Sequence, residues 1–126
     1  MDPQQELFTK IKMELEKTYD VYDSILPPDD TPYPFIYLGD NQLDDIFYKG
    51  IIGGRVYQTI HVWHNNSRQR GLVSSILLFI KQTLRMIDKT TNFNWTLRSI
   101  NQQILPDNST AEPLMHGVLE VEYRFN

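Results

Sequence analysis

The 126-residue sequence contains no cysteine, which excludes a disulfide framework, a thiolate nucleophile and a cysteine-ligated zinc site. Its longest uninterrupted apolar run, residues 76–80, is five residues long. A membrane-spanning helix needs about 20 such residues. The first residues, MDPQQELF, are polar and acidic, unlike the basic and apolar start of a signal peptide. We therefore expect a soluble protein that no segment directs out of the cytoplasm.

Hydrophobic residues make up 40% of the chain and charged residues 22%, as is ordinary for a globular fold. A chain of this length predicts a single domain over residues 1–126 with a few elements around one core. Polar, proline-containing or glycine-flanked stretches predict mobile loops near residues 19–34, 39–53 and 106–113.

Charge is distributed unevenly along the chain. Residues 1–50 carry 11 acidic and 4 basic side chains, a net charge of −7, whereas residues 51–126 carry 5 acidic and 8 basic ones, a net charge of +3. A solvated acidic loop would explain this asymmetry. Complementary faces for head-to-tail association are the alternative explanation.

Residues 55–64 alternate between two faces, a pattern that predicts a β-strand. One face carries Val56, Gln58, Ile60, Val62 and His64, and the other carries Arg55, Tyr57, Thr59, His61 and Trp63.

A helix is predicted from residue 68 onward, with Ser67 as its N-cap. The stripe expected to face the sheet consists of Leu72, Ile76, Phe79, Ile80 and Thr83. The flank formed by Val73, Leu77 and Leu84 is expected to face another helix or a neighbouring subunit. This helix is apolar over more than half of its circumference, wider than one sheet face requires, and so predicts a second partner.

The other predicted elements are a first helix over residues 3–18, capped by Asp2, and strands over residues 35–38, 94–105 and 114–125. Residues 39–53 are interpreted as a mobile excursion whose apolar centre orders on a partner; an extended β-hairpin is the alternative. The predicted fold class is α+β in the order α-β-β-α-β-β. Its four-stranded, mostly antiparallel sheet carries two helices packed on one face.

The sequence shows no catalytic constellation and no cofactor or metal motif. His61, His64 and His116 are dispersed over two strands, and His61 and His64 point to opposite faces. No glycine-rich phosphate-binding motif occurs. Arg68 and Arg70 alone are weak evidence for a nucleic-acid-binding surface in an acidic protein. The residues proposed for interaction with partners are Asp44, Asp45, Phe47, Tyr48, Arg68 and Arg70.

Two stretches carry a family resemblance. A proline-rich loop enters a short strand at residues 31–39 (TPYPFIYLG), and a long strand ends at residues 61–67 (HVWHNNS) before the apolar helix. Over residues 25–90 the chain resembles the tail completion, or tail terminator, proteins of long-tailed bacteriophages.

The resemblance implies a non-enzymatic virion protein, made in the host cytoplasm, without cofactor, membrane or small-molecule substrate. It implies a homo-oligomer, a hexameric ring on the head-proximal end of the tail tube, which ends tube polymerisation and supports head-tail joining. The partners would be the major tail tube protein and a head connector or neck protein, and contact with DNA passing through the lumen stays open. The alternatives are a head-side connector protein and a small enzyme or nucleic-acid-processing domain.

Overall fold

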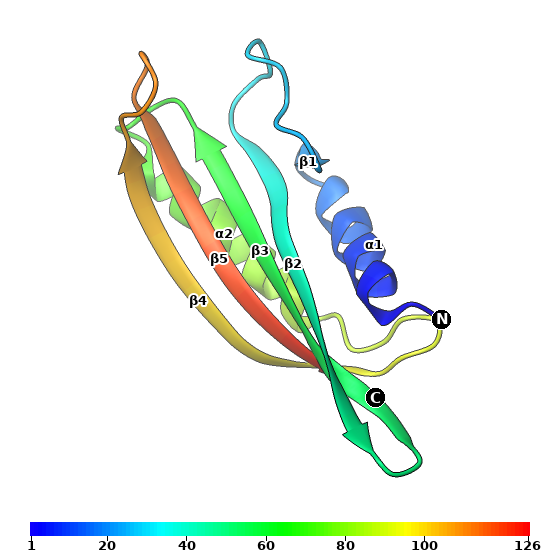
Figure 1. The fold of residues 1–126 in the computed structure, drawn as a ribbon. Coiled ribbons are helices and arrows are strands. Elements are labelled where there is room, and N and C mark those ends of the chain that lie inside the picture. The colour runs from blue at the N-terminus through cyan, green and yellow to red at the C-terminus, as the bar shows by residue number, and fades with distance from the viewer.

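The computed structural model describes residues 1–126, except for the side chain of Tyr48. Its elements are α1 (Pro3–Glu16), β1 (Val21–Asp23), β2 (Phe35–Tyr48), β3 (Ile51–His64), α2 (Arg70–Arg85), β4 (Trp95–Asp107) and β5 (Leu114–Phe125). The strands form one five-stranded sheet in the order β1-β2-β3-β5-β4. Figure 1 shows α2 behind β3 and β5, and α1 beside β2.

The α+β class is confirmed, but the sheet has five strands and is mixed. The additional strand is β1, which pairs in parallel with residues 36–38 of β2, whereas every other pair is antiparallel. The segment 19–34 was predicted as a loop because of its prolines. The first of them is Pro27, so the three residues of β1 keep the N–H groups that a sheet requires.

Residues 39–53 are a hairpin, not an excursion without secondary structure. β2 and β3 pair along their length as far as Tyr48 and Ile51, and Gly50 adopts a φ of +75° in the two-residue turn. Solvent reaches much of the outer half of the hairpin, so the period-two alternation that reveals a strand is weak there. The extended hairpin considered as the alternative is therefore the correct interpretation, and mobility of its tip stays a prediction.

A bulge between Leu38 and Asn41 interrupts the ladder of β2 and β3. The buried amide of Gln58 holds it: Asn41 Nδ2 donates to Gln58 Oε1 at 2.5 Å, and Gln58 Nε2 donates to the Thr59 carbonyl at 2.8 Å. Asn41 in turn accepts a hydrogen bond from Gln4 Nε2 at 2.5 Å, which connects the bulge to α1.

Both helices pack on the same face of the sheet and share one apolar core. Asp2 caps α1 as predicted, since its side chain accepts a hydrogen bond from the Gln5 backbone N–H at 3.1 Å. The predicted alternation of β3 is confirmed, with one face buried and the other partly exposed. Buried core side chains include Leu7, Ile11, Leu15, Ile36, Leu38, Val56, Ile60, Val62, Leu119, Val121 and Tyr123.

The start and the orientation of α2 differ from the prediction. Gln69, not Ser67, occupies the N-cap position, and it makes no side-chain capping bond. The flank of Val73 and Leu77 faces the sheet, because both side chains lie against the position where a Cβ on Gly117 of β5 would be. The predicted stripe is partly correct: Ile76 and Ile80 are buried in the core, whereas Leu72 is 39% exposed, so the sheet-facing side is rotated toward Val73 and Leu77. Gly117 provides the hollow that admits this flank, a feature of β5 that α2's own sequence cannot reveal.

β4 contains an irregularity that the predicted alternation missed. Leu97 pairs with Tyr123 and Ser99 with Glu122, so Arg98 is an extra residue that reverses the faces after it. The strand also runs to Asp107, and the third predicted loop is correspondingly shorter. Pro106 is tolerated because β4 is an edge strand whose outer N–H groups need no ladder partner.

Candidate interaction surfaces

The residues proposed for interaction lie at two opposite ends of the molecule. Asp44, Asp45 and Phe47 lie on the hairpin of β2 and β3, which extends past the ends of β4 and β5 in Figure 1. Arg68 and Arg70 lie at the other end of β3, where the chain turns into α2. The structure therefore divides this set into two groups, and the side chain of Tyr48 lies outside the described residues.

The projecting end of the hairpin is apolar. The side chain of Phe47 is 90% exposed, and its antiparallel partner Ile52 is 68% exposed. Ile51 beside them is 59% exposed. β5 pairs with β3 only from Gly54 onward, so these side chains extend beyond the sheet. Exposed apolar clusters of this kind mark sites of association.

Ile51 and Ile52 were missed as candidates in the sequence. They stand directly before Gly53 and Gly54, at the end of residues 39–53, which were predicted to be a loop. The signal was two β-branched side chains next to a glycine pair. Gly54 is where the hairpin leaves the sheet: a Cβ there would lie 2.5 Å from the Asp44 carbonyl oxygen and 2.8 Å from the Phe125 ring.

Four rings gather on the face of the sheet opposite the helices. The Trp63 and His116 rings stack with centroids 3.7 Å apart and planes 7° apart. His61 stacks on His116 at 4.9 Å, and Tyr37 lies 6.0 Å from His61. Gly39 makes room for this group, since a Cβ on it would lie 2.7 Å from His61 Nε2.

The two imidazoles of this group are hydrogen-bonded, with His61 Nδ1 2.7 Å from His116 Nε2. Burial lowers the pKa of both rings, and the neighbouring His61 lowers that of His116 further, to about 4. The histidines lie on two strands, as predicted, but the contact between His61 and His116 was not expected. The register places His116 opposite Trp63, one strand across from His61.

His64 lies on the core face, as the alternation predicted, with Nε2 2.5 Å from Gln69 Oε1. Over the described residues, no group of three histidine, aspartate or glutamate side chains is placed to hold a metal ion. In the His61–His116 pair, one nitrogen of each ring is already engaged in the hydrogen bond between the two rings.

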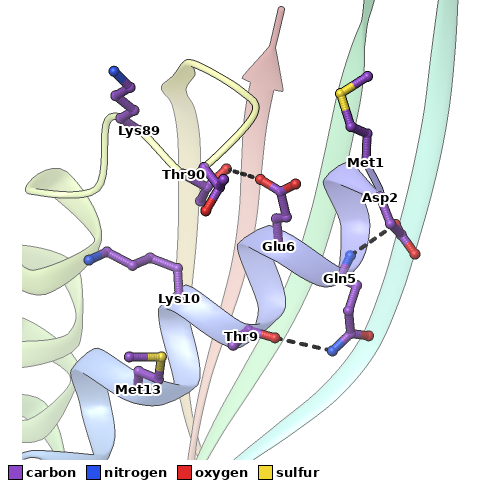
Figure 2. Close-up of a pocket in the computed structure, with 10 residues that line it drawn as sticks. Met1, Asp2, Gln5, Glu6, Thr9, Lys10, Met13, Lys89 and Thr90 are labelled. Carbon is purple, nitrogen blue, oxygen red and sulfur yellow. Dashed lines mark hydrogen bonds between the residues drawn. The ribbon is translucent and has the colours of Figure 1, made fainter.

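A shallow groove of about 780 Å³ separates the first turns of α1 from residues 89–91 (Figure 2). Both acidic residues that line it make structural hydrogen bonds: Asp2 caps α1, while Glu6 Oε1 accepts from Thr90 Oγ1 at 2.8 Å and Glu6 Oε2 accepts from Asn92 Nδ2 at 2.6 Å. The hydrogen bonds that Glu6 accepts lower its pKa, and the bond from the Asn92 side chain has the largest effect. The carboxylate ties α1 to the segment before β4 and is not free for acid–base chemistry.

Arg68 and Arg70 are both exposed at the turn before α2. The turn itself is ordered by a local bond, from the Arg68 backbone N–H to Asn66 Oδ1 at 3.0 Å. Neither helix in the described structure is long and apolar enough to cross a membrane.

Comparison with solved structures shows which class of fold this is. The same two-helix, mixed-sheet fold occurs in a chain of the virion of a native gene transfer agent particle, with a TM-score of 0.67 and 15% identity, covering 98% of this chain and 93% of that one. It also occurs in the bacteriophage SPP1 gp17 protein, with a TM-score of 0.65 and 20% identity, covering 98% of this chain and 91% of that one. At these identities the likeness concerns the fold, and it extends over almost the whole of each chain. No protein-family model matches the sequence, and no curated protein matches it either.

Proposed function

We propose that this chain is a structural virion protein that forms a hexameric ring on the head-proximal end of a bacteriophage tail tube. The ring ends tube polymerisation and provides the surface for head-tail joining. The observation that carries this proposal is the end-to-end match in fold to a gene transfer agent virion chain and to bacteriophage SPP1 gp17. The resemblance of residues 25–90 to tail terminator proteins supports it independently.

The two ends of the molecule support a role between two different partners. The hairpin end presents Phe47, Ile51 and Ile52 to solvent, which suits docking on an apolar surface of the major tail tube protein. The opposite end presents Arg68 and Arg70, which suits a connector or neck protein. In this proposal the protein is not an enzyme and needs no cofactor, and a lumen contact with passing DNA involves the exposed arginines.

The experiment is electron microscopy of particles made without this protein. We expect tails of abnormal and variable length, because nothing stops the tube. Headless tails of normal length would instead identify a head-side connector protein, the alternative for a virion component of this fold. Complete particles with normal tails would overturn both proposals.

The matched control is complementation with the wild-type chain supplied in the same host. It restores normal tail length if the defect belongs to this protein. Gold or antibody labelling of the supplied chain then places it on the particle, and we expect label at the head-proximal end of the tail.

A further inference from the structure

The sheet has two lateral edges that carry charge of opposite sign. At one edge lie the end of α1, β1 and the outer side of β2. The acidic side chains there are exposed, and we call them the acidic edge: Glu16, Asp20, Asp40, Asp44 and Asp45. Asp44 accepts a hydrogen bond from its near neighbour Gln42, whose Nε2 donates to Oδ1 at 2.9 Å.

The other edge is formed by β4 and by the flank of α2 that faces away from α1. Phe79 marks the flank toward α1, because its ring meets Tyr19 at 5.2 Å. Lys81 and Arg85 lie about 200° and 240° around the helix from Phe79, on the far side. With Arg98 of β4 they form the basic edge, and the 48% exposed Leu78 lies on the same flank.

Among the described residues, these basic side chains have no acidic partner. In the described part of the structure, the ion pairs are those of Lys10, Lys12, Lys17 and Arg55. The charges of Lys81, Arg85 and Arg98 are therefore available to another molecule.

The register places the two edges at matching levels. Asp44 pairs with Arg55, Arg55 with Arg124, and Arg124 with Thr96, so Asp44 on one edge is level with Thr96 on the other. Arg98 stands two residues further along β4. Rotation about an axis parallel to the strands keeps these levels, so it brings Asp44 of one copy to the level of Thr96 of the next, and Asp45 to the level of Trp95.

Strand direction and free backbone agree with such an arrangement. β4 runs opposite to β2, so copies placed edge to edge would meet as antiparallel strands. Beyond β1, the outer side of residues 41–47 has no strand partner among the described residues, and neither does that of β4. Unpaired edges are templates for association. A two-fold dimer through either edge would instead place like charges together.

We propose that successive copies of this chain join with the basic edge of one against the acidic edge of the next, a contact that repeats around the ring. The inference rests on the proposed function for the ring itself and adds the surfaces that close it. It also gives a role to the difference in net charge between residues 1–50, at −7, and residues 51–126, at +3.

Charge reversal tests the contact, with size measured by multi-angle light scattering at low salt. One variant, D44R/D45R, makes the hairpin part of the acidic edge basic, and another, R85D/R98D, makes the basic edge net acidic. We expect each alone to dissociate, with a dissociation constant raised roughly tenfold or more, because like charges then face each other. Mixed in equal amounts, the two variants should reassemble as alternating copies. The control D29R/D30R makes the same change in charge on the exposed loop before β2 and should assemble normally.

The outcomes separate the two proposals. A wild-type ring that survives both reversals overturns the contact and leaves the proposed function standing. A wild-type chain that stays monomeric with purified tail tubes present overturns the ring and the contact together. Loss of assembly in both variants without recovery in the mixture also overturns the pairing of opposite edges, provided that circular dichroism shows folded chains.

Cysteine cross-linking locates the contact. The chain has no cysteine, so a D44C/T96C variant introduces the only two thiols. Within one copy these positions are three strand spacings apart, about 14 Å, which is too far for a disulfide. Oxidation should therefore give a ladder of covalent oligomers on a non-reducing gel, and a D29C/T96C control should give none. Absence of the ladder in an assembled D44C/T96C ring would refute this register.

Discussion

The Tyr123 hydroxyl donates a hydrogen bond to the carbonyl oxygen of Leu84 at 2.5 Å, joining β5 to the last turn of α2. The side chain of Tyr123 is fully buried, and burial raises the pKa of its hydroxyl well above the ordinary value. The same carbonyl also accepts from the Ile87 backbone N–H at 3.1 Å. This pair fixes the end of α2 on the sheet.

Tyr123→Phe should lower the free energy of unfolding by about 0.5–1.5 kcal/mol, the net value of one hydrogen bond. The cost stays in this range because Ile87 continues to satisfy the Leu84 carbonyl. Chemical denaturation measures it, and Tyr57→Phe on the partly exposed face is the matched control, expected to be neutral. A loss above about 3 kcal/mol would mean that the hydroxyl supports more than this single bond.

Gly54→Ala should destabilise the fold by about 1–3 kcal/mol, because the added methyl group has no space. Its Cβ would lie 2.5 Å from the Asp44 carbonyl oxygen and 2.8 Å from the Phe125 ring. Gly71→Ala is the control, since a Cβ there meets nothing within 4 Å and alanine favours a helix. Thermal unfolding should shift down for the first variant and slightly up for the second. Equal effects would show that the backbone at Gly54 moves easily.

The sequence predicted those elements whose two faces differ. β3 and β5 are buried on one side and partly exposed on the other, so their alternation was visible, and their registers with one another follow it. The first helix was correct because its cap, Asp2, and its narrow apolar stripe are local features. The outer half of the hairpin lacks a buried face and was therefore missed.

Long-range features of the candidate surfaces could not be predicted in the same way. His61 and His116 are 55 residues apart, and only the pairing of β3 with β5 brings them into contact. The orientation of α2 depends on the hollow at Gly117, in a strand that follows it by many residues. The charge asymmetry was visible along the chain, but its separation onto two edges required the strand order.

Acid should destabilise the protein through the His61–His116 pair. The pKa of His116 falls from 6.5 to about 4 on folding, because of burial and the neighbouring His61, and that of His61 is lowered by burial. Between pH 6.5 and about 4 the unfolded chain therefore binds more protons than the folded chain. The stability contributed by the pair is fully present above pH 6.5 and is lost as the pH falls toward 4.

Denaturation at a series of pH values measures this dependence. A H61Q/H116Q variant should show a flatter curve between pH 6.5 and about 4.5, above the range in which carboxylates with lowered pKa values, such as Asp23 beside Lys12, contribute. An unchanged slope in the double variant would show that other groups control acid stability.

The apolar end of the hairpin should matter for assembly and not for folding. In F47S/I52S both changes fall on side chains that are 90% and 68% exposed, so the free energy of unfolding should change by less than about 0.5 kcal/mol. Loss of two apolar contacts should nevertheless weaken docking on the tail tube, and particles carrying this variant should show overlong tails. Ile25→Ser is the control, because Ile25 is 80% exposed in the loop that precedes β2, away from the hairpin.

Tail length, infectivity and denaturation, measured on the same variants, separate a role in assembly from a role in folding. Normal tails in F47S/I52S particles would exclude the hairpin as the tube-binding surface, and a large loss of stability would show that Phe47 and Ile52 pack within the fold.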